Sequence, residues 1–169
     1  MDQIYTHPKR KTKVVFVQLG SPSEPTTKAL RKYLRKFLGD PRVVDINPWL
    51  WKIILNFFVL PFRPKKSAKL YARIWDGKSF PLITNTRDFT NNVREELKKI
   101  DPNGYVEVNH AFLLSPPYVN EVYDSWEDDL KKGIGATKLL VIPMFPQYSE
   151  STIASGIDAL AKELSKRVK

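Results

Sequence analysis

The sequence predicts an α/β fold: a Rossmann-like three-layer domain with a parallel sheet of about four strands and helices on both faces. Short apolar runs rich in β-branched residues are typical of buried parallel strands. Segments with helical periodicity lie between these runs, and this alternation favours a parallel sheet with right-handed crossovers. The four candidate strands are residues 14–17, 43–46, 106–109 and 138–143.

The first strand and the first helix have clear boundaries. Residues 14–17, Val-Val-Phe-Val, precede Gly20, which indicates a turn. Thr26 or Thr27 can cap the helix that follows. Up to Leu38 its apolar residues recur three and four positions apart with basic residues between them, so we expect one buried and one solvated face.

Residues 48–62 form the most unusual stretch. Apolar side chains fill most positions, and Lys52 and Asn56 interrupt them. Neither a two-residue period nor a clean helical stripe is present, and one helix rarely hides so continuous a run. We therefore expect part of this stretch to be exposed. The alternative is that all of it is core.

The remaining segments complete the alternation of strands and helices. Further helices are expected through 71–75, over 88–100 and 119–132, and from a cap at Ser149 or Ser151 to about Arg167, with a loop at 78–81. In such folds ligands bind beyond the carboxyl ends of the strands. The loops of interest are therefore 18–22, 109–117 and 143–152.

Composition limits the classes of protein to consider. A chain of 169 residues suits one domain with a sizeable core, and we expect a basic N-terminal tail over 1–12 followed by one domain over 13–169. Cysteine is absent, which excludes disulfides and thiolate metal sites. No membrane span or secretory signal is evident, so a cytoplasmic protein is expected, with peripheral contact to the inner membrane allowed.

The net charge of +10 favours an anionic partner such as nucleic acid, acidic lipid or a ligand with carboxylates. The aromatic residues lie in apolar runs instead of alternating with a basic groove, and no nucleic-acid-binding motif is present. We therefore expect no nucleic-acid partner.

Four motifs along the chain match those of one known family. Residues 14–22 are similar to a first strand ending in Asn-Leu-Gly-x-Pro, and residues 33–44 match Tyr-Leu-x-x-Phe-Leu-x-Asp-Pro-Arg-Val-Val. Residues 60–75 match a segment leading into Tyr-x-x-Ile-Trp, and residues 146–152 match Pro-Gln-Tyr-Ser-x-Ser-Thr. In these motifs the chain resembles the ferrochelatase family, whose members insert iron into a porphyrin.

The resemblance implies a chelatase-like fold of two similar Rossmann-like domains, with the porphyrin between them. This chain resembles the first domain only, and the family's catalytic histidine and glutamate belong to the second, beyond Lys169. The family's third strand usually runs into Met-Arg-Tyr-x-x-Pro. Here Leu113 and Leu114 replace the arginine and tyrosine, or Ala111 and Phe112 do so in an alternative alignment.

The same resemblance implies that several residues bind the porphyrin. An apolar side chain would contact the face of the macrocycle, and basic and hydroxyl groups would bind its propionates. The candidates are Leu19, Arg63, Lys66, Ser79, Tyr148 and Ser149. For the basic residues the alternative is a solvated surface, and for Ser149 it is ordinary helix capping. Ser79 is displaced by one position from the family's Gly-Ser-Pro site, because Phe80 precedes Pro81.

The resemblance also implies an apolar lip that borders the cleft and can touch the bilayer. An exposed apolar patch rimmed by lysines behaves as an interfacial anchor. The candidate lip residues are Trp49, Trp51, Ile54, Phe57 and Phe58.

His110 is a candidate base or axial ligand, although a lone histidine is more often structural. Histidines and carboxylates at metal-ligand spacing are not evident, so neither a protein-built metal site nor a built-in cofactor is expected. The expected ligand is porphyrin or heme, with ferrous iron as a substrate if the protein is catalytic.

Two functions follow as expectations. The first is a ferrochelatase-type tetrapyrrole-binding domain of heme biosynthesis. It would be incomplete as an enzyme on its own, and would need a homodimer or a separate C-terminal half. The alternative is a non-catalytic porphyrin-binding or heme-binding protein at the membrane surface.

Overall fold

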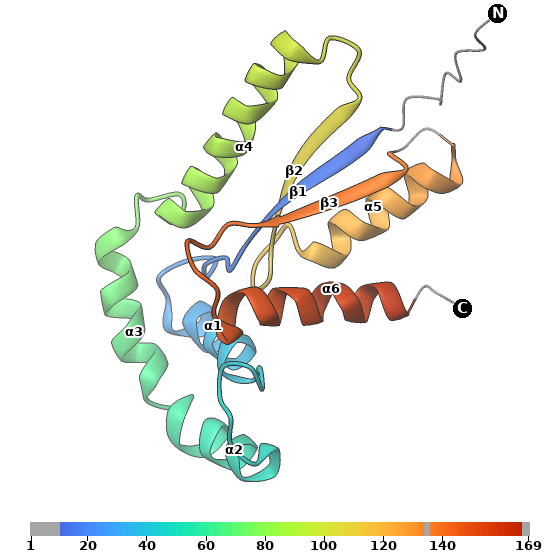
Figure 1. Cartoon of the computed structure of the whole chain (residues 1–169). Helices are drawn as coiled ribbons and strands as arrows, with labels where there is room; N and C mark the ends of the chain where they lie inside the picture. The colour runs from blue at the N-terminus through green and yellow to red at the C-terminus, as the bar shows by residue number, and fades with distance from the viewer. Residues whose placement is uncertain (1–10, 134–135, 167–169) are drawn as a thin grey trace, which may run out of the picture.

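The computed structural model of the chain describes residues 11–133 and 136–166 (Figure 1). The sheet consists of three parallel strands, β1 (Thr12–Gln18), β2 (Val106–Phe112) and β3 (Lys138–Pro143), in the order β2-β1-β3. Helices lie on both of its faces. The predicted α/β class and parallel sheet are therefore confirmed.

Six α-helices connect and cover the strands in the described part of the chain. They are α1 (Thr27–Leu38), α2 (Pro48–Ile54), α3 (Arg63–Tyr71), α4 (Pro81–Ile100), α5 (Val119–Lys131) and α6 (Ser155–Ser165). Successive side chains of a strand point to opposite faces. Val14 and Phe16 accordingly pack beneath α4, and Val15 and Val17 pack beneath α5 and α6.

Three short helical turns extend these helices. Leu55–Val59 and Glu150–Ala154 are π-helical, and Ala72–Ile74 is a 3₁₀ turn. The first π-helical turn continues α2, the second leads into α6, and the 3₁₀ turn follows α3.

The strand expected at residues 43–46 does not form. Residues 41–43 form a turn, and the segment after it is irregular. The backbone N–H groups of Val43 and Val44 donate to the carbonyl of Asp40 at 2.9 and 3.2 Å. These N–H groups are therefore not available to pair with another strand. The side chains of Val43 and Val44 pack instead against the buried cluster that includes Tyr33, Leu34 and Leu38 of α1.

Several boundaries also differ from expectation. The helix expected from Asp88 begins at Pro81, because proline is well suited to the first helical position. The helix expected through 71–75 is the end of α3 and its 3₁₀ turn. β1 starts at Thr12, one residue before the expected domain boundary. The rest of the expected tail, residues 1–10, lies outside the described residues.

β3 lies at the edge of the sheet in the described part of the chain and is not a buried strand, although residues 139–142 are all apolar. Leu140 on this strand is 43% exposed. An edge position leaves one side of a strand without a neighbour, so the apolar run is only partly covered.

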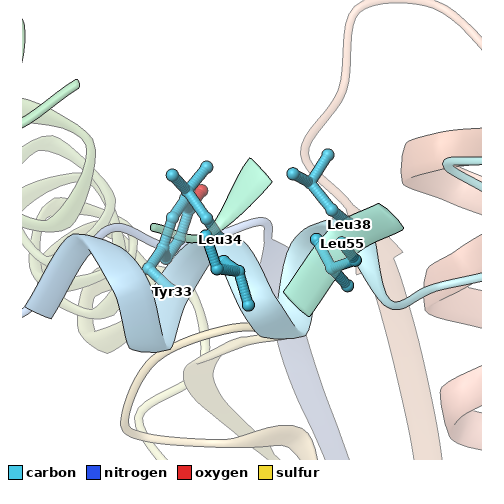
Figure 2. Close-up of a cluster of buried hydrophobic side chains, with 5 residues drawn as sticks. Tyr33, Leu34, Leu38 and Leu55 are labelled. Atoms are coloured by element: carbon cyan, nitrogen blue, oxygen red, sulfur yellow. The ribbon is translucent and has the colours of Figure 1, made fainter. Parts of the chain in front are cut away.

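A second core lies below the sheet, around α1 (Figure 2). Tyr33, Leu34 and Leu38 of α1 pack with Leu55 and Leu60 from the following segment. The side chain of Thr26 accepts the backbone N–H of Ala29 at 3.2 Å and caps the helix as expected. This core attaches residues 48–62 to the carboxyl side of the sheet.

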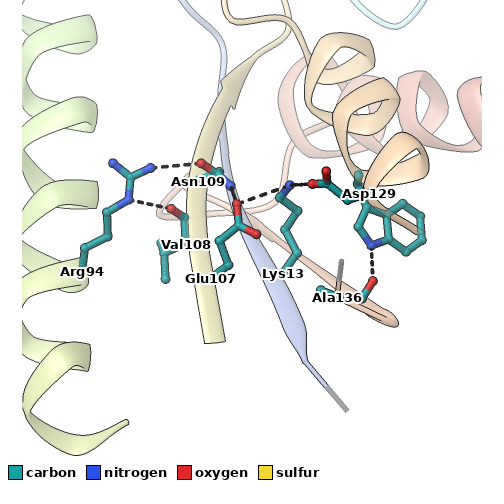
Figure 3. Close-up of polar contacts among 8 residues, drawn as sticks. Lys13, Arg94, Glu107, Val108, Asn109, Asp129 and Ala136 are labelled. Carbon is teal, nitrogen blue, oxygen red and sulfur yellow. Dashed lines mark hydrogen bonds and ion pairs between the residues drawn. The ribbon is translucent and has the colours of Figure 1, made fainter. Parts of the chain in front are cut away.

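Polar contacts fix the opposite, amino-terminal part of the sheet (Figure 3). Lys13 is only 3% exposed and lies 3.3 Å from Glu107 and 3.8 Å from Asp129. Arg94 of α4 donates to the carbonyl of Val108 at 2.7 Å and to the Asn109 side chain at 3.0 Å. These contacts hold α4 and α5 to the strands.

Candidate functional site

The turn after β1 is held by contacts from the loop after β2 and from α1. Gly20 has a φ of 93°, a region that L-residues rarely adopt. A Cβ at this position would overlap the hydroxyl of buried Ser115. That hydroxyl accepts the backbone N–H of Ser21 at 3.2 Å, and Tyr33 donates to the Gly20 carbonyl at 3.2 Å. The backbone beside Leu19 is therefore fixed.

The loops that leave the other two strands lie against this turn. Leu113 and Leu114 donate their backbone N–H groups to the carbonyls of Gln18 and Leu19, both at 3.0 Å. On the other side, the Gln18 side chain donates to the carbonyl of Met144 at 2.7 Å. The carboxyl ends of all three strands thus converge around Gln18 and Leu19.

A pocket of about 320 Å³ opens beyond the ends of β1 and β2. Its apolar wall includes Trp75, Phe80, Ile83 and Leu114. Its polar lining includes Ser21, Ser23, Ser79, Tyr118, Lys32 and Lys36. Aliphatic and aromatic walls with a few cations and hydroxyls suit a ligand with an apolar body and an anionic group.

Lys32 and Lys36 are functional candidates that the sequence reasoning missed. They lie four residues apart and therefore share one face of α1. The ammonium of Lys36 donates to the Tyr118 hydroxyl at 2.9 Å and lies 4.1 Å from the centre of that ring. The available signal was the position of α1 directly after the first strand, together with the four-residue spacing of these lysines on it.

Among the predicted porphyrin-binding residues, Ser79 lines this pocket. It belongs to a turn in which the backbone N–H groups of Ser79 and Lys78 donate to the Asp76 carboxylate at 2.6 and 2.8 Å. These two bonds lower the pKa of Asp76. The carboxylate thus fixes the backbone that presents Ser79.

Arg63 and Lys66 lie in the first turns of α3, and both are exposed. Neither forms an ion pair with another residue in the described part of the chain. They do not line the pocket beside Ser79. Their guanidinium and ammonium groups are free to bind a carboxylate, and a solvated basic surface remains the alternative.

Tyr148 and Ser149 lie on the loop after β3. Tyr148 is 67% exposed. The Ser149 hydroxyl lies 2.5 Å from that of Thr152 and 3.4 Å from that of Ser151. The helical segment begins directly after Ser149, but this serine does not cap it with its side chain. Its hydroxyl therefore takes part in a cluster of hydroxyls on the loop after β3, and these residues do not line the pocket beside Ser79.

The expected exposure of the apolar stretch is confirmed for three of the five lip candidates. Trp49, Phe57 and Phe58 are 80%, 69% and 66% exposed. Trp51 and Ile54 are half-buried, and the indole N–H of Trp51 donates to the carbonyl of Leu38 at 2.6 Å. One side of the stretch is therefore anchored to α1 while the other is presented to solvent.

His110 lies within β2, not on the loop beyond it. It pairs in register with Phe16 and shares the sheet face that α4 covers. Its Nδ1 is buried without a hydrogen-bond partner. Burial, with the charges of Arg94 and Arg87, lowers the pKa of His110. The imidazole faces α4 instead of the loops at the strand ends.

None of the helices among the described residues is both long and apolar enough to cross a membrane. No cluster of three or more histidine or acidic side chains there has positions suited to holding a metal ion.

Comparison with known proteins identifies similar sequences. Residues 11–169 match the sequence model of the family described as Ferrochelatase. The chain is 43% identical to the ferrochelatase of Idiomarina loihiensis over 154 residues, which are 91% of this chain and 41% of that protein. It is 40% identical to the ferrochelatase of Teredinibacter turnerae over 168 residues, covering 98% of this chain and 44% of the relative.

Ferrochelatase 1 of Shewanella oneidensis gives a similar result. It is 40% identical over 161 residues, which are 95% of this chain and 46% of that protein. The match thus extends over nearly the whole chain, while the chain spans less than half the length of these relatives.

Proposed function

The chain belongs to the ferrochelatase family, and on this premise we propose that it forms one wall of a porphyrin-metallation site. The observation that carries the proposal is the convergence of all three strand ends around Leu19. Ligands of open α/β sheets bind at this edge. The macrocycle would lie against Leu19 and Leu114, with its edge in the pocket beside Ser79.

The basic and hydroxyl groups would bind the propionates. Lys36 and Ser79 line the pocket, and Arg63 lies exposed on the neighbouring α3. Arginine can bind a carboxylate through two parallel hydrogen bonds, and lysine acts as a point charge. A pocket of about 320 Å³ is at the low end for small-molecule sites, so it would hold part of the macrocycle.

Metal insertion also requires a base for the pyrrole nitrogens and groups that deliver ferrous iron as a substrate. In the described part of the chain, the lining of this pocket includes neither histidine nor carboxylate. We place these groups on a surface that faces the strand ends, supplied by a second half or by a second copy of the chain. The proposed role is thus in heme biosynthesis, as part of a larger site.

A non-catalytic porphyrin or heme carrier is the second candidate. The apolar Leu114 in the pocket wall favours it, because leucine can pack against a macrocycle but cannot transfer a proton or bind a metal. This candidate predicts tight porphyrin binding without metal insertion.

A porphyrin titration followed by absorbance tests the proposal. We expect the protein to shift the absorbance band of protoporphyrin or coproporphyrin, and Lys36→Met to weaken binding about tenfold through loss of one charge-assisted contact. Lys98→Met is the matched control, since Lys98 lies on α4 in an exposed pair with Glu95. Absence of binding would contradict both candidate functions.

Added ferrous or zinc ion separates the two candidates. Formation of the metalloporphyrin spectrum by the protein alone would exclude a pure carrier and would require a dimeric site. Binding without insertion would exclude a self-sufficient enzyme. Size measurement by sedimentation then shows whether a second copy contributes.

We also propose that the exposed side of residues 48–62 contacts a membrane surface. Trp49, Phe57 and Phe58 are exposed, and Lys52 and Arg63 lie beside them in sequence. Aromatic side chains next to cations favour the interface of an anionic bilayer. Such contact would bring the site to the phase in which an apolar porphyrin partitions.

Flotation with vesicles of phosphatidylglycerol and phosphatidylcholine tests this contact. Replacing Trp49, Phe57 and Phe58 together by serine should reduce bound protein about tenfold or more, because interfacial affinity follows buried apolar area. The control is Ile100→Ser, since Ile100 is 79% exposed at the carboxyl end of α4, which lies far from α2 (Figure 1). Equal loss in the control, or none in the triple variant, would contradict the proposal.

A further inference from the structure

The loop that carries Tyr148 and Ser149, residues 144–149, has a firm attachment where it leaves β3. The backbone N–H of Met144 donates to the carbonyl of Val17 at 2.8 Å, and the side chain of Gln18 donates back to the carbonyl of Met144 at 2.7 Å. The first residue of the loop is thus fixed to β1. The direction of the rest depends on where its other end is held.

The other end passes into the π-helical turn Glu150–Ala154 and α6, and two polar contacts hold α6 there. The Ser155 hydroxyl donates to the carboxylate of Asp40. The guanidinium of Arg42 forms a two-pronged contact with Asp158, at 2.7 and 3.3 Å. Both partners come from the segment that follows α1, which is distant in sequence and adjacent in the fold.

The segment that holds α6 is itself rigid. The Asp40 carboxylate also accepts the backbone N–H of Arg42 at 2.8 Å. The Asp40 carbonyl accepts two further backbone N–H groups, from Val43 and Val44, whose side chains pack against the α1 cluster. One carboxylate therefore orients the Arg42 backbone and receives Ser155 at the same time.

These contacts contribute orientation more than stability. The side chains of Arg42 and Asp158 are 42% and 54% exposed, and exposed ion pairs add little to the free energy of unfolding. Apolar packing by Leu160, and by Leu113 next to Gly156, already attaches α6 to the molecule. Apolar packing is non-directional, whereas a two-pronged guanidinium contact has a defined geometry.

The charge of Arg42 also acts near the loop itself. The hydrogen bond and charge of Asp158 raise the pKa of Arg42, and Glu150 and Tyr148 contribute in the same direction. The guanidinium thus lies within electrostatic range of the loop that bears Tyr148.

We propose that Asp40 and Arg42 are positioning residues. They hold α6 and so orient the loop formed by residues 144–149 toward the porphyrin. This inference rests on the proposed function of that loop. Because the same segment anchors residues 48–62 through Val43 and Val44, it sets two walls of the site together: the loop after β3 and the base of the apolar lip.

Single replacements at Arg42 and Asp158 separate positioning from direct binding of the anionic porphyrin. Arg42→Gln should raise the Kd for protoporphyrin about fivefold. Asp158→Asn adds net positive charge, so it would strengthen binding if Arg42 contacted the ligand directly. It should weaken binding by a similar factor if Arg42 acts by positioning. The exchanged pair, Arg42→Asp with Asp158→Arg, should recover most of the loss.

Hydrogen exchange provides a readout that does not depend on porphyrin. Backbone amides of 150–154 should exchange about fivefold faster in Arg42→Gln and Asp158→Asn than in the wild type, and should recover protection in the exchanged pair. Lys98→Gln, which removes a comparable exposed pair with Glu95, should change neither exchange nor affinity. The melting temperature should stay within about 2 °C in all four variants.

Three outcomes overturn the inference: unchanged exchange at 150–154 in Arg42→Gln, tighter porphyrin binding by Asp158→Asn, or an equal effect of Lys98→Gln. If the wild-type protein binds no porphyrin, the proposed function fails instead. Exchange then decides the anchoring alone, since loss of protection in the single variants and its recovery in the exchanged pair would retain Arg42 as an anchor of this loop.

Discussion

The two ends of the sheet use charged residues in opposite ways. At the amino-terminal end, Lys13 is buried between Glu107 and Asp129, and Arg94 satisfies backbone and side-chain oxygens of β2. At the carboxyl end, Arg63 is exposed without an ion-pair partner in the described part of the chain. Charges at the first end stabilise the fold, whereas the guanidinium of Arg63 at the second remains available to a ligand.

The difference concerns side chains and not backbone. The turn at Gly20 is as tightly built as the amino-terminal end, because Ser115 and Tyr33 bind its backbone. A site of this kind needs a rigid frame with unpaired groups on it. The carboxyl end combines both, and the following variants test the contrast from the largest expected effect to the smallest.

Removing both acidic partners of Lys13 should have the largest effect on stability. Glu107→Gln with Asp129→Asn would leave a buried ammonium without a counter-charge, and we expect the free energy of unfolding to fall by about 3 kcal/mol in urea titrations. Glu95→Gln, which breaks the exposed pair with Lys98, should cost less than about 0.5 kcal/mol. Similar losses in the two variants would contradict the burial of Lys13.

Gly20→Ala tests the frame at the carboxyl end. The new methyl group would meet Ser115 and the Cβ of Phe112 at a positive φ, so we expect a loss of about 2 kcal/mol or more. Gly77→Ala is the matched control, because Gly77 also has a positive φ but has no atoms within 4 Å of the added methyl. Its loss should be about 1 kcal/mol, and equal losses would mean that close packing at Gly20 is unimportant.

His110 should give the smallest effect, visible only as a pH dependence. The folded state lowers the pKa of His110, so the unfolded state binds the proton more readily. The stability that His110 contributes is therefore complete above its unfolded pKa of 6.5 and falls as the pH drops below it. Unfolding at about pH 8 and about pH 5.5 should show a larger acid loss for the wild type than for His110→Asn. An identical loss of stability on acidification in the wild type and in His110→Asn would indicate that the imidazole is solvated in the folded protein.

Local patterns in the sequence were sufficient for much of the fold. The apolar run at 14–17 and the helical spacing up to Leu38 predicted β1 and α1, because strand and helix periods are properties of the chain itself. The excess of apolar residues in 48–62 predicted exposure, since one helix face cannot bury them all. The carboxyl ends of the predicted strands indicated which loops meet at one edge of the sheet.

Hydrogen bonds and strand pairing decided the rest. Val43 and Val44 have strand-forming side chains, but the carbonyl of Asp40, three and four residues before them, takes their N–H groups in a local turn. His110 appeared to end a strand, but β2 pairs with β1 as far as Phe112, and this pairing turns the imidazole toward α4. Neither outcome follows from strand propensity, which does not include these partners.

The sequence by itself thus determined the α/β class, the order of most elements and the presence of an exposed apolar stretch next to basic residues. Only the tertiary structure decided which cations stay unpaired, that Lys32 and Lys36 share a pocket with Ser79, and that Arg42 holds α6. The physical reason is distance along the chain. The periodicity of a segment indicates which of its side chains are buried. A site depends instead on contacts between residues far apart in the sequence, such as Arg42 and Asp158, and only folding brings these residues together.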